Sequence, residues 1–442
     1  MTVVDHRETV ELLQSLIRNE CVNDGTPDSG GERANADLLA AYLEGAGLDV
    51  QRFTSRQDRT SIVARIEGSD PSAPRLCLMG HTDVVPVNPA GWSRDPFGGE
   101  LIDGEVWGRG ALDMLCVTSS MAVAFRALAR SGWRPKGDLI YFGVADEEAG
   151  GTLGAKWMVD HNWDAIACDY LLTEMGGFRL GDGRSIAIHT AEKGLAWRRL
   201  TIHGTPGHGS SPYGADNAIV KAARIVQRIH EQRPTPQLDE LWSEQVRTSG
   251  LSNDIQAALL DPARLADTLA SLPTRQARNL HACAHTTMSC NVVHGGQKTN
   301  VIPDRVQLDI DIRTMPGVTG PDLDVLLRDV LGDLAGDVDI EVLHDDAATR
   351  SPTHGPLWEA VETRVRQQFP NCRLSPRLGA GATDGRFFRD KGVIAYGAAM
   401  FSSDVDLAAI GSRFHGNDER IDIESLRLST QLWYDLARDL LT

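Results

Sequence analysis

Three apolar segments of this chain end abruptly in side chains that bind metals or transfer protons. The segments and the residues after them are Leu76–Met79 with His81 and Asp83, Leu139–Val144 with Glu147 and Glu148, and Tyr170–Leu172 with Glu174. Short continuous apolar runs are typical of buried strands in an α/β sheet. Because ligands and catalysts collect beyond the carboxyl ends of such strands, we expect these polar residues to share one edge of a sheet.

The segments around these strands predict an α/β fold, a doubly wound mixed sheet with helices on both faces. The apolar spacing predicts helices over Val10–Ile17, Leu38–Leu43, part of Ala111–Arg130 and Ile423–Leu441, and strands over Val50–Phe53, Ser61–Ile66 and Arg75–Met79.

The pattern changes at about Lys193. Leu195–Ile202 and Arg305–Thr314 alternate apolar and polar residues, as half-exposed strands do. A helix is expected over Asp216–His230, and a polar stretch interrupted by proline, Pro234–Arg278, is also expected to be helical. We therefore predict a catalytic domain made of residues 1–192 and 317–442, and an inserted α+β lid or dimerisation domain made of residues 193–316.

Composition excludes several classes of partner. Among 442 residues, 44 are Lys or Arg and 61 are Asp or Glu, a net charge of −17, so neither nucleic acid nor an anionic membrane is an expected partner. No apolar run approaches the roughly 20 residues of a membrane span, and Met1–Glu8 lacks the pattern of a signal peptide. The seven cysteines form no Cys-x-x-Cys pair, which favours free thiols and a cytoplasmic location.

The polar residues at the strand ends suggest a metal site. Adjacent carboxylates at Glu147 and Glu148 would repel each other beside a buried strand, and a cation removes this conflict if one ligates and the other acts as a base. His81 offers an imidazole ligand, and Asp83 can accept the hydrogen bond from the other ring nitrogen.

Three further candidates are Asp113, after a glycine-rich turn, Glu174 and His415. Each residue alone has an ordinary alternative: a histidine can cap a strand, a Glu-Glu pair can be a solvated turn, and Asp113 can cap the next helix. Taken together, the set favours a site with nitrogen and oxygen ligands, which suits zinc, with cobalt or manganese as substitutes.

The order of these motifs resembles the co-catalytic di-zinc exopeptidases, the family of aminoacylase, carboxypeptidase G, acetylornithine deacetylase and succinyl-diaminopimelate desuccinylase. The likeness covers essentially the whole chain. The motifs that carry it are His81-x-Asp83, Gly108-Arg-Gly-Ala-x-Asp113, Asp146-Glu147-Glu148, Glu174 and His415-Gly416.

The resemblance implies two divalent metal ions. Asp113 would bridge them, His81 and Glu174 would complete one site, and Glu148 and His415 would complete the other. The family also implies a cis peptide after the bridging aspartate.

The resemblance also makes Glu147 the general base and Asp83 the partner of His81. The chain departs from the family after the bridging aspartate, where Met114-Leu115-Cys116 stands in place of the usual Met-Lys-Gly. Neither changed residue is a ligand, so the difference concerns the helix start and the nearby pocket.

The inserted domain resembles the family's lid. His208 would stabilise the oxyanion, often in the active site of a dimer mate, and Asn300 and Arg313 would hold a substrate carboxylate. Gly381 and Thr383 lie in a turn that resembles the pocket lining of the desuccinylases.

Two of these assignments have alternatives in the sequence itself. His208 lies among Gly and Pro, so it could be an ordinary loop residue, and Arg313 could form an ion pair with Asp309 or Asp311.

The resemblance implies a homodimeric hydrolase that cleaves an amide bond beside a free carboxylate, in an N-acyl amino acid or short peptide. A dipeptidase, carbamoyl-amide or deaminating reaction at the same site remains open, as does a non-catalytic binding relative. A serine hydrolase is disfavoured because the chain has no Gly-x-Ser-x-Gly elbow.

Overall fold

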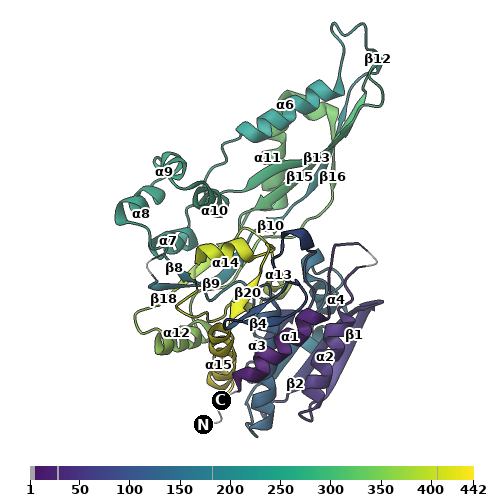
Figure 1. Cartoon of the computed structure of the whole chain (residues 1–442). Coiled ribbons are helices and arrows are strands. Elements are labelled where there is room, and N and C mark those ends of the chain that lie inside the picture. Colours follow the sequence, from purple (N-terminus) through teal and green to yellow (C-terminus); the bar gives the residue numbers. More distant parts are fainter. Residues whose placement is uncertain (1–4, 27–28, 182, 406) are drawn as a thin grey trace.

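In the computed structural model, the chain forms a large body from which an elongated arm projects (Figure 1). The structure describes residues 5–26, 29–181, 183–405 and 407–442. Residues 1–4, part of the segment considered for a signal peptide, lie outside these ranges.

A mixed sheet forms the centre of the large body, as predicted. Its strands in spatial order are β1 (Val50–Arg56), β2 (Arg59–Ile66), β6 (Leu139–Val144), β3 (Leu76–His81), β7 (Tyr170–Thr173), β19 (Ile394–Gly397), β9 (Ser185–Glu192) and β17 (Thr349–Arg350), and β8 (Arg179–Leu180) and β18 (Arg373–Gly379) also pair with β9. β3 runs parallel to β6 and β7, so the carboxyl ends of these three neighbours lie at the same edge.

Helices cover both faces of this sheet because successive strand side chains point to opposite sides. Leu76 and Leu78 of β3 belong to one buried cluster, and Cys77 and Met79 belong to the other. The main helices of the first cluster are α1 (His6–Arg18), α2 (Arg33–Glu44), α3 (Leu115–Arg130), α12 (Pro356–Gln368) and α15 (Ile423–Leu440), and Ile410 also belongs to it. The helices of the second cluster are α4 (Ala155–His161), α5 (Trp163–Ile166) and α13 (Gly385–Asp390). The doubly wound architecture is therefore confirmed.

The remaining short elements of the body lie near its loops. They are η1 (Pro89–Gly91), η2 (Glu147–Ala149), α14 (Leu407–Arg413) and a three-stranded sheet of β4 (Glu100–Ile102), β5 (Glu105–Trp107) and β20 (Arg420–Asp422).

The arm contains a separate antiparallel sheet, made of β10 (Gly194–Leu195), β11 (Arg198–His203), β13 (Thr287–Gly295), β15 (Arg305–Thr314) and β16 (Val338–Val342). The helices α6 (Ala218–Glu231) and α11 (Gly320–Leu331) share its apolar cluster, and η3 (Gly332–Asp337) precedes β16. β15 alternates buried and partly exposed residues as predicted. β12 (Gly207–His208) and β14 (Val301–Ile302) pair with each other, and β12 lies at the far end of the arm (Figure 1).

The polar stretch predicted to be helical forms four helices, α7 (Glu240–Arg247), α8 (Asn253–Leu259), α9 (Leu265–Ser271) and α10 (Thr274–Ala284). Their apolar residues, among them Trp242 and Leu280, form one cluster with Ala191 of β9 and Leu378 of β18. These helices therefore brace the large sheet and do not extend the arm.

The division into domains stays a prediction. The arm sheet takes β16 from beyond residue 316, and β17 then returns to the large sheet. We therefore propose that an inserted domain, if it is delimited by its sheet, extends past Val342.

Two findings bear on cellular environment. No helix in the described ranges is long and apolar enough to cross a bilayer. All seven cysteines are free, and six of them are buried. The cytoplasmic location stays a prediction.

Candidate active site

The carboxyl edge of the large sheet gathers side chains from three neighbouring strands. β3 ends at His81, β7 ends one residue before Glu174, and β6 leads through Asp146 into η2, which begins with Glu147. Gly80 allows α3 to pack closely against β3, because a Cβ there would come within 2.9 Å of the Thr118 Cα.

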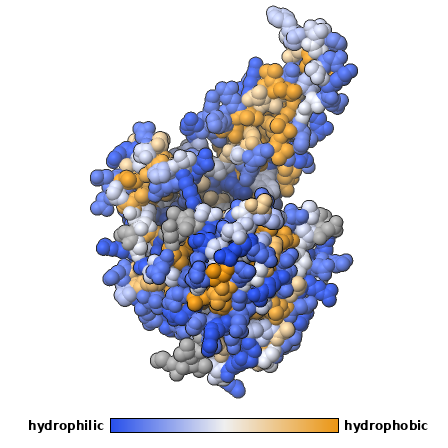
Figure 2. Space-filling view, in the orientation of Figure 1, coloured by the Kyte–Doolittle hydropathy of each residue, from blue (hydrophilic) through white to orange (hydrophobic). Residues whose placement is uncertain are grey.

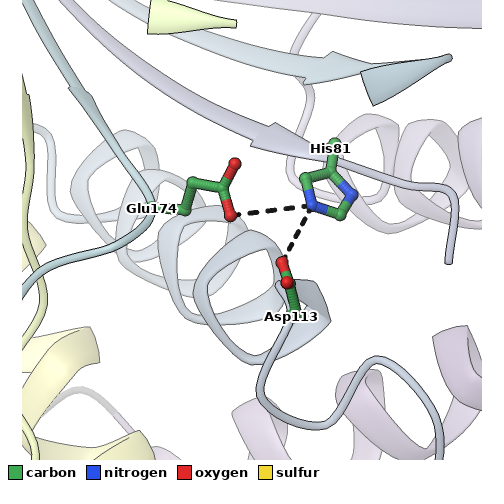
Figure 3. A group of neighbouring side chains, drawn as sticks. All are labelled: His81, Asp113 and Glu174. Carbon is green, nitrogen blue, oxygen red and sulfur yellow. Dashed lines mark hydrogen bonds and ion pairs between the residues drawn. The ribbon is translucent and has the colours of Figure 1, made fainter. Parts of the chain in front are cut away.

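The first group of possible metal ligands consists of His81, Asp113 and Glu174 (Figure 3). The His81 Nε2 lies 3.3 Å from the Asp113 Oδ1 and 3.8 Å from the Glu174 Oε2. All three side chains converge on one point from separate elements (Figure 3).

The second group consists of Asp113, Glu148 and His415. The His415 Nε2 lies 3.2 Å from the Asp113 Oδ2 and 3.4 Å from the Glu148 Oε2. Asp113 thus offers one carboxylate oxygen to each group, which is the arrangement that a bridging ligand requires.

These groups fit divalent cations. The ligand atoms within each group all lie within 4.8 Å of one another, and ligands about 2.1 Å from a tetrahedral zinc ion are about 3.4 Å apart. The Glu148 Oε1 is buried and has no hydrogen-bond partner among the described residues. Four carboxylates face only two imidazoles, so the site has an excess of negative charge that two cations would neutralise.

The environment of the site raises the pKa values of Glu174 and His415 and lowers that of Asp113. Burial and the Glu147 and Asp113 carboxylates raise the pKa of Glu174 well above its usual value. Although burial opposes its ionisation, hydrogen bonds from His415 and His81 hold the pKa of Asp113 low. The hydrogen bonds to Asp113 and Glu148 raise the pKa of His415 to about 10.

The turn that carries Asp113 is held by Glu419, which the sequence analysis did not identify. The Glu419 Oε1 accepts hydrogen bonds from the backbone N–H groups of Leu112 (2.6 Å) and Asp113 (3.0 Å), and its Oε2 pairs with Arg109 at 2.8 Å. The peptide between Asp113 and Met114 is cis, as the resemblance implied.

Asp83 contacts His81 through both its main chain and its carboxylate, and its role as the partner of His81 stays a prediction. The His81 Nδ1 lies 3.0 Å from the backbone oxygen of Asp83 and 3.5 Å from its carboxylate, so the ring is oriented mainly by the main chain. The Asp83 Oδ2 instead accepts hydrogen bonds from Asn23 Nδ2 (2.8 Å) and from the backbone N–H of Glu148 (3.1 Å). Asp83 therefore links the two ligand groups.

A buried polar network behind the site was also missed. Arg59 pairs with Glu32 and lies 3.5 Å from the Asp146 Oδ1, while the backbone N–H of Asp146 donates to the Glu32 Oε1 at 3.1 Å. Glu32 and Arg59 lie outside every motif, so only their three-dimensional proximity reveals this role.

Glu147 lies beside both groups without belonging to either. Its Oε2 is 4.0 Å from the His81 Nε2, and the residue lines the central cleft. Burial, together with the neighbouring Asp384 and Glu148 carboxylates, raises the pKa of Glu147 well above its usual value.

Three residues at the site adopt the left-handed backbone conformation: Asp146 (φ 72°), Met175 (φ 72°) and His415 (φ 52°). This conformation is uncommon for residues other than glycine, and it costs roughly 1–3 kcal/mol at each position. Each residue is, or directly adjoins, a member of the site. The backbone is therefore bent where it presents these side chains.

The ligand groups open into a cleft of about 910 Å³. Gly381 and Thr383 line it, as predicted, and so does Arg313. The hydroxyl of Thr383 donates to the buried Glu192 at 2.6 Å, so this side chain also fixes its own turn.

Arg313 is already paired. Its Nε and Nη2 donate to the two carboxylate oxygens of Asp311 at 2.7 and 3.1 Å. The ion pair considered in the sequence analysis is therefore present, and the prediction that Arg313 holds a substrate carboxylate stays a prediction.

His208 and Asn300 are not brought to the cleft. Both are exposed, and the backbone N–H of Gly209 donates to the Asn300 backbone oxygen at 2.8 Å, so the two residues lie near each other at the end of the arm. The His208 Nδ1 lies 2.7 Å from the Ser210 hydroxyl. Within one chain, these two residues and the ligand groups are at separate places.

Comparisons with known proteins agree with this geometry. The sequence profile of peptidase family M20/M25/M40 matches residues 77–439. The chain is 26% identical over 444 aligned positions to a succinyl-diaminopimelate desuccinylase of Cereibacter sphaeroides, covering 98% of each protein. It is 27% identical over 390 positions to the N-fatty-acyl-amino acid synthase/hydrolase PM20D1 of Xenopus tropicalis, covering 85% of this chain and 74% of that protein.

A solved structure shares the fold. The M20 family metallo-carboxypeptidase Sso-CP2 from Sulfolobus solfataricus superposes with a TM-score of 0.72 at 18% identity, over 98% of this chain and 99% of that one.

Proposed function

The chain belongs to peptidase family M20/M25/M40, and we propose that within it the protein is a two-metal hydrolase that cleaves an amide bond beside a free carboxylate. One observation carries this proposal: two ligand groups share Asp113, and Glu147 lies next to them without being part of either.

We propose that His81, Asp113 and Glu174 hold one cation, and that Asp113, Glu148 and His415 hold the other. Two divalent cations bound there, zinc or its substitutes cobalt and manganese, would supply Lewis acidity and increase the acidity of a water. The His81 Nδ1–H donates to the backbone of Asp83, which leaves the Nε2 lone pair directed at the site.

Glu147 performs the proton transfers. A carboxylate at this position, inside the cleft and outside the ligand groups, accepts a proton from the attacking water and returns it to the leaving nitrogen. Burial and the neighbouring carboxylates raise the pKa of Glu147, which favours its holding a proton between the two transfers.

We propose an N-acyl amino acid or a short peptide as the substrate. The support is chemical similarity: the names of the two relatives above describe hydrolysis of an acyl group from an amino acid, with a fatty acyl group in one and a succinyl group in the other. The cleft has both polar and apolar walls, so it can hold either kind of acyl chain.

We also propose a homodimer formed through the arm. Hydrophobic side chains gather on the arm surface (Figure 2). Val293 is 64% exposed on β13, Ile219 is 47% exposed on α6, and both line an apolar groove. An exposed apolar edge strand is a typical association surface. Such a dimer would allow His208 of one subunit to reach the cleft of the other.

The proposed function is tested with a panel of N-acyl amino acids, dipeptides and N-carbamoyl amino acids, assayed on the metal-free protein and after addition of zinc, cobalt or manganese. We expect hydrolysis only with metal, and highest for N-acyl amino acids or short peptides. Metal-independent hydrolysis, or none with any metal, would contradict the proposal. Preference for N-carbamoyl substrates would instead indicate the carbamoyl-amide reaction.

A further inference from the structure

One row of residues crosses four neighbouring strands of the large sheet at the level of the ligand groups. Thr173 of β7 is in register with Gly397 of β19, Gly397 with His189 of β9, and His189 with Arg377 of β18. Strands are about 4.8 Å apart, so the backbone of Arg377 lies about 14 Å from that of Thr173, the neighbour of Glu174. Arg377 and His189 line the same cleft as Glu147.

Three arginines line this cleft, and two of them are neutralised by carboxylates. Arg313 is paired with Asp311 through two hydrogen bonds. Arg386 donates to Asp346 at 3.1 Å and to the backbone oxygens of Thr383 and Gly150 at 2.8 Å each.

Arg377 is different. No carboxylate of the described chain lies within ion-pair distance of its guanidinium, and its side chain makes one hydrogen bond, from Nη1 to the backbone oxygen of Gln245 at 3.3 Å. A guanidinium carries five N–H donors and stays charged. A partly buried arginine without a counter-ion is costly unless an anion joins it.

The helices α7–α10 hold this arginine in place. Gln245 of α7 accepts from Arg377 through its backbone, and its side-chain Oε1 accepts from the backbone N–H of Leu378 at 3.0 Å. Gln245 is itself buried. The four-helix segment thus fixes the part of β18 that carries Arg377.

His189 lies beside Arg377 on the neighbouring strand, and its ring also has unused hydrogen-bonding capacity. Its side chain is 4% exposed, and neither ring nitrogen has a hydrogen-bond partner among the described residues. The ring packs over Gly379, where an added Cβ would lie 2.0 Å from its Nε2. Burial lowers the pKa of His189 to about 4, so the ring is neutral and carries one N–H donor.

We infer that Arg377, assisted by His189, receives a carboxylate of the substrate in this cleft. This inference rests on the proposed function and deepens it, because it places the anion-binding residue on the sheet of the large body and not on the arm. A guanidinium binds a carboxylate with two parallel hydrogen bonds, and the neutral imidazole adds a donor without adding charge.

The surroundings fit a small organic acid. Phe178, Ala187 and Leu195 line the same cleft and provide apolar surface beside the polar pair. The distance across the row leaves room for a short substrate between the ligand groups and Arg377. The carboxylate can be that of the amino acid or that of a dicarboxylic acyl group, since both have the same chemistry.

Binding to the metal-free protein tests the inference without relying on catalysis. Metal is removed with a chelator and dialysis, and calorimetry measures the affinity for N-acetyl-leucine, N-acetyl-leucinamide and N-succinyl-leucinamide. We expect at least one carboxylate to bind about 10- to 100-fold more tightly than N-acetyl-leucinamide, and Arg377→Gln to abolish that preference. N-acetyl-leucine as the preferred ligand identifies the amino-acid carboxylate, and N-succinyl-leucinamide identifies the acyl carboxylate.

The controls separate this arginine from others. Arg427→Gln, on the surface of α15 and paired with Glu424, should keep the preference, and Arg377→Lys should keep part of it because the charge remains. The thermal midpoint of each variant shows whether it is folded. Equal affinity of the wild type for all three compounds, no binding of any, or loss of the preference in Arg313→Gln but not in Arg377→Gln would overturn the inference. None of these results depends on whether the metal-loaded protein hydrolyses an amide.

Discussion

The edge of the large sheet and the end of the arm both carry residues that the resemblance assigned to one active site. In the structure, the residues at the sheet edge lie together, whereas those at the arm end lie apart from them. At the sheet edge, the Nε2 atoms of His81 and His415 lie 3.3 and 3.2 Å from the two carboxylate oxygens of Asp113. At the arm end, the His208 imidazole is exposed, and its hydrogen bonds to the described residues are to Ser210 of its own loop.

The difference shows which parts of a site a single chain can build alone. Strand ends are held by the hydrogen bonds of the sheet and by helices on both faces, so side chains that follow neighbouring parallel strands meet automatically. A residue on a projecting arm reaches the site only through closure of the arm or through a second subunit.

The largest effect is expected from Asp113, which both ligand groups share. Asp113→Asn should remove both metal ions and all measurable turnover, because one substitution weakens both groups. Metal content by mass spectrometry and the hydrolysis rate measure this. Asp70→Asn, an exposed loop variant, should retain both, and a metal content for Asp113→Asn equal to that of the wild type would break the two-group interpretation.

Glu147 should separate metal binding from chemistry. We expect Glu147→Gln to keep its metal and to lose about 10²- to 10⁴-fold in kcat, the usual contribution of a general base. The matched control is Glu67→Gln on the surface, which should leave both quantities unchanged. Retained turnover in Glu147→Gln would remove this residue from the role of base.

The next prediction concerns the arm, and asks whether His208 takes part in catalysis. His208→Ala should lose about 10²- to 10³-fold in kcat if the imidazole stabilises the oxyanion. The control is His161, an exposed histidine of α4, and His161→Ala should leave kcat unchanged.

Mixing two inactive variants then decides which subunit supplies His208. An equal mixture of His208→Ala and Glu147→Gln subunits should recover about a quarter of the wild-type activity if the histidine acts across a dimer. No recovery from dimers shown to have exchanged subunits would mean that the arm closes on its own cleft.

The smallest effect concerns Lys193, at the junction of the two regions. Its Nζ donates to the His285 backbone oxygen (2.8 Å) and to the Thr287 hydroxyl (2.9 Å), and burial lowers its pKa from 10.5 to about 7. The unfolded chain therefore binds more protons than the folded chain between these two values, so this lysine makes stability rise with pH in that window.

Lys193→Met should remove this contribution. Relative to the variant, the wild type should gain up to about 1.4 kcal/mol of stability per pH unit above pH 7, measured by denaturant unfolding at several pH values. Parallel stability profiles of the two proteins would show that the lysine is not buried at the junction in solution.

Much of the large body could be predicted because its signals are local. Continuous apolar strands, the alternation over Arg305–Thr314 and the glycine turn before Asp113 all appear in short stretches of sequence. The supporting residues Glu32, Arg59 and Glu419 could not be found in this way. Their partners are distant in the chain, and charged residues of these types are common on surfaces.

Sequence alone determined which polar residues follow the buried strands, and the resemblance carried by its motifs assigned the candidate ligands and base. The polar residues meet because neighbouring parallel strands must present their carboxyl ends together. Tertiary structure alone decided how Arg386 and Arg377 of the cleft are used. Asp311 lies two residues from Arg313 on the same strand, so that ion pair is local in sequence. Whether the other two guanidinium groups are neutralised depends on which carboxylate the fold brings within a few ångströms: it brings Asp346 to Arg386 and, among the described residues, none to Arg377.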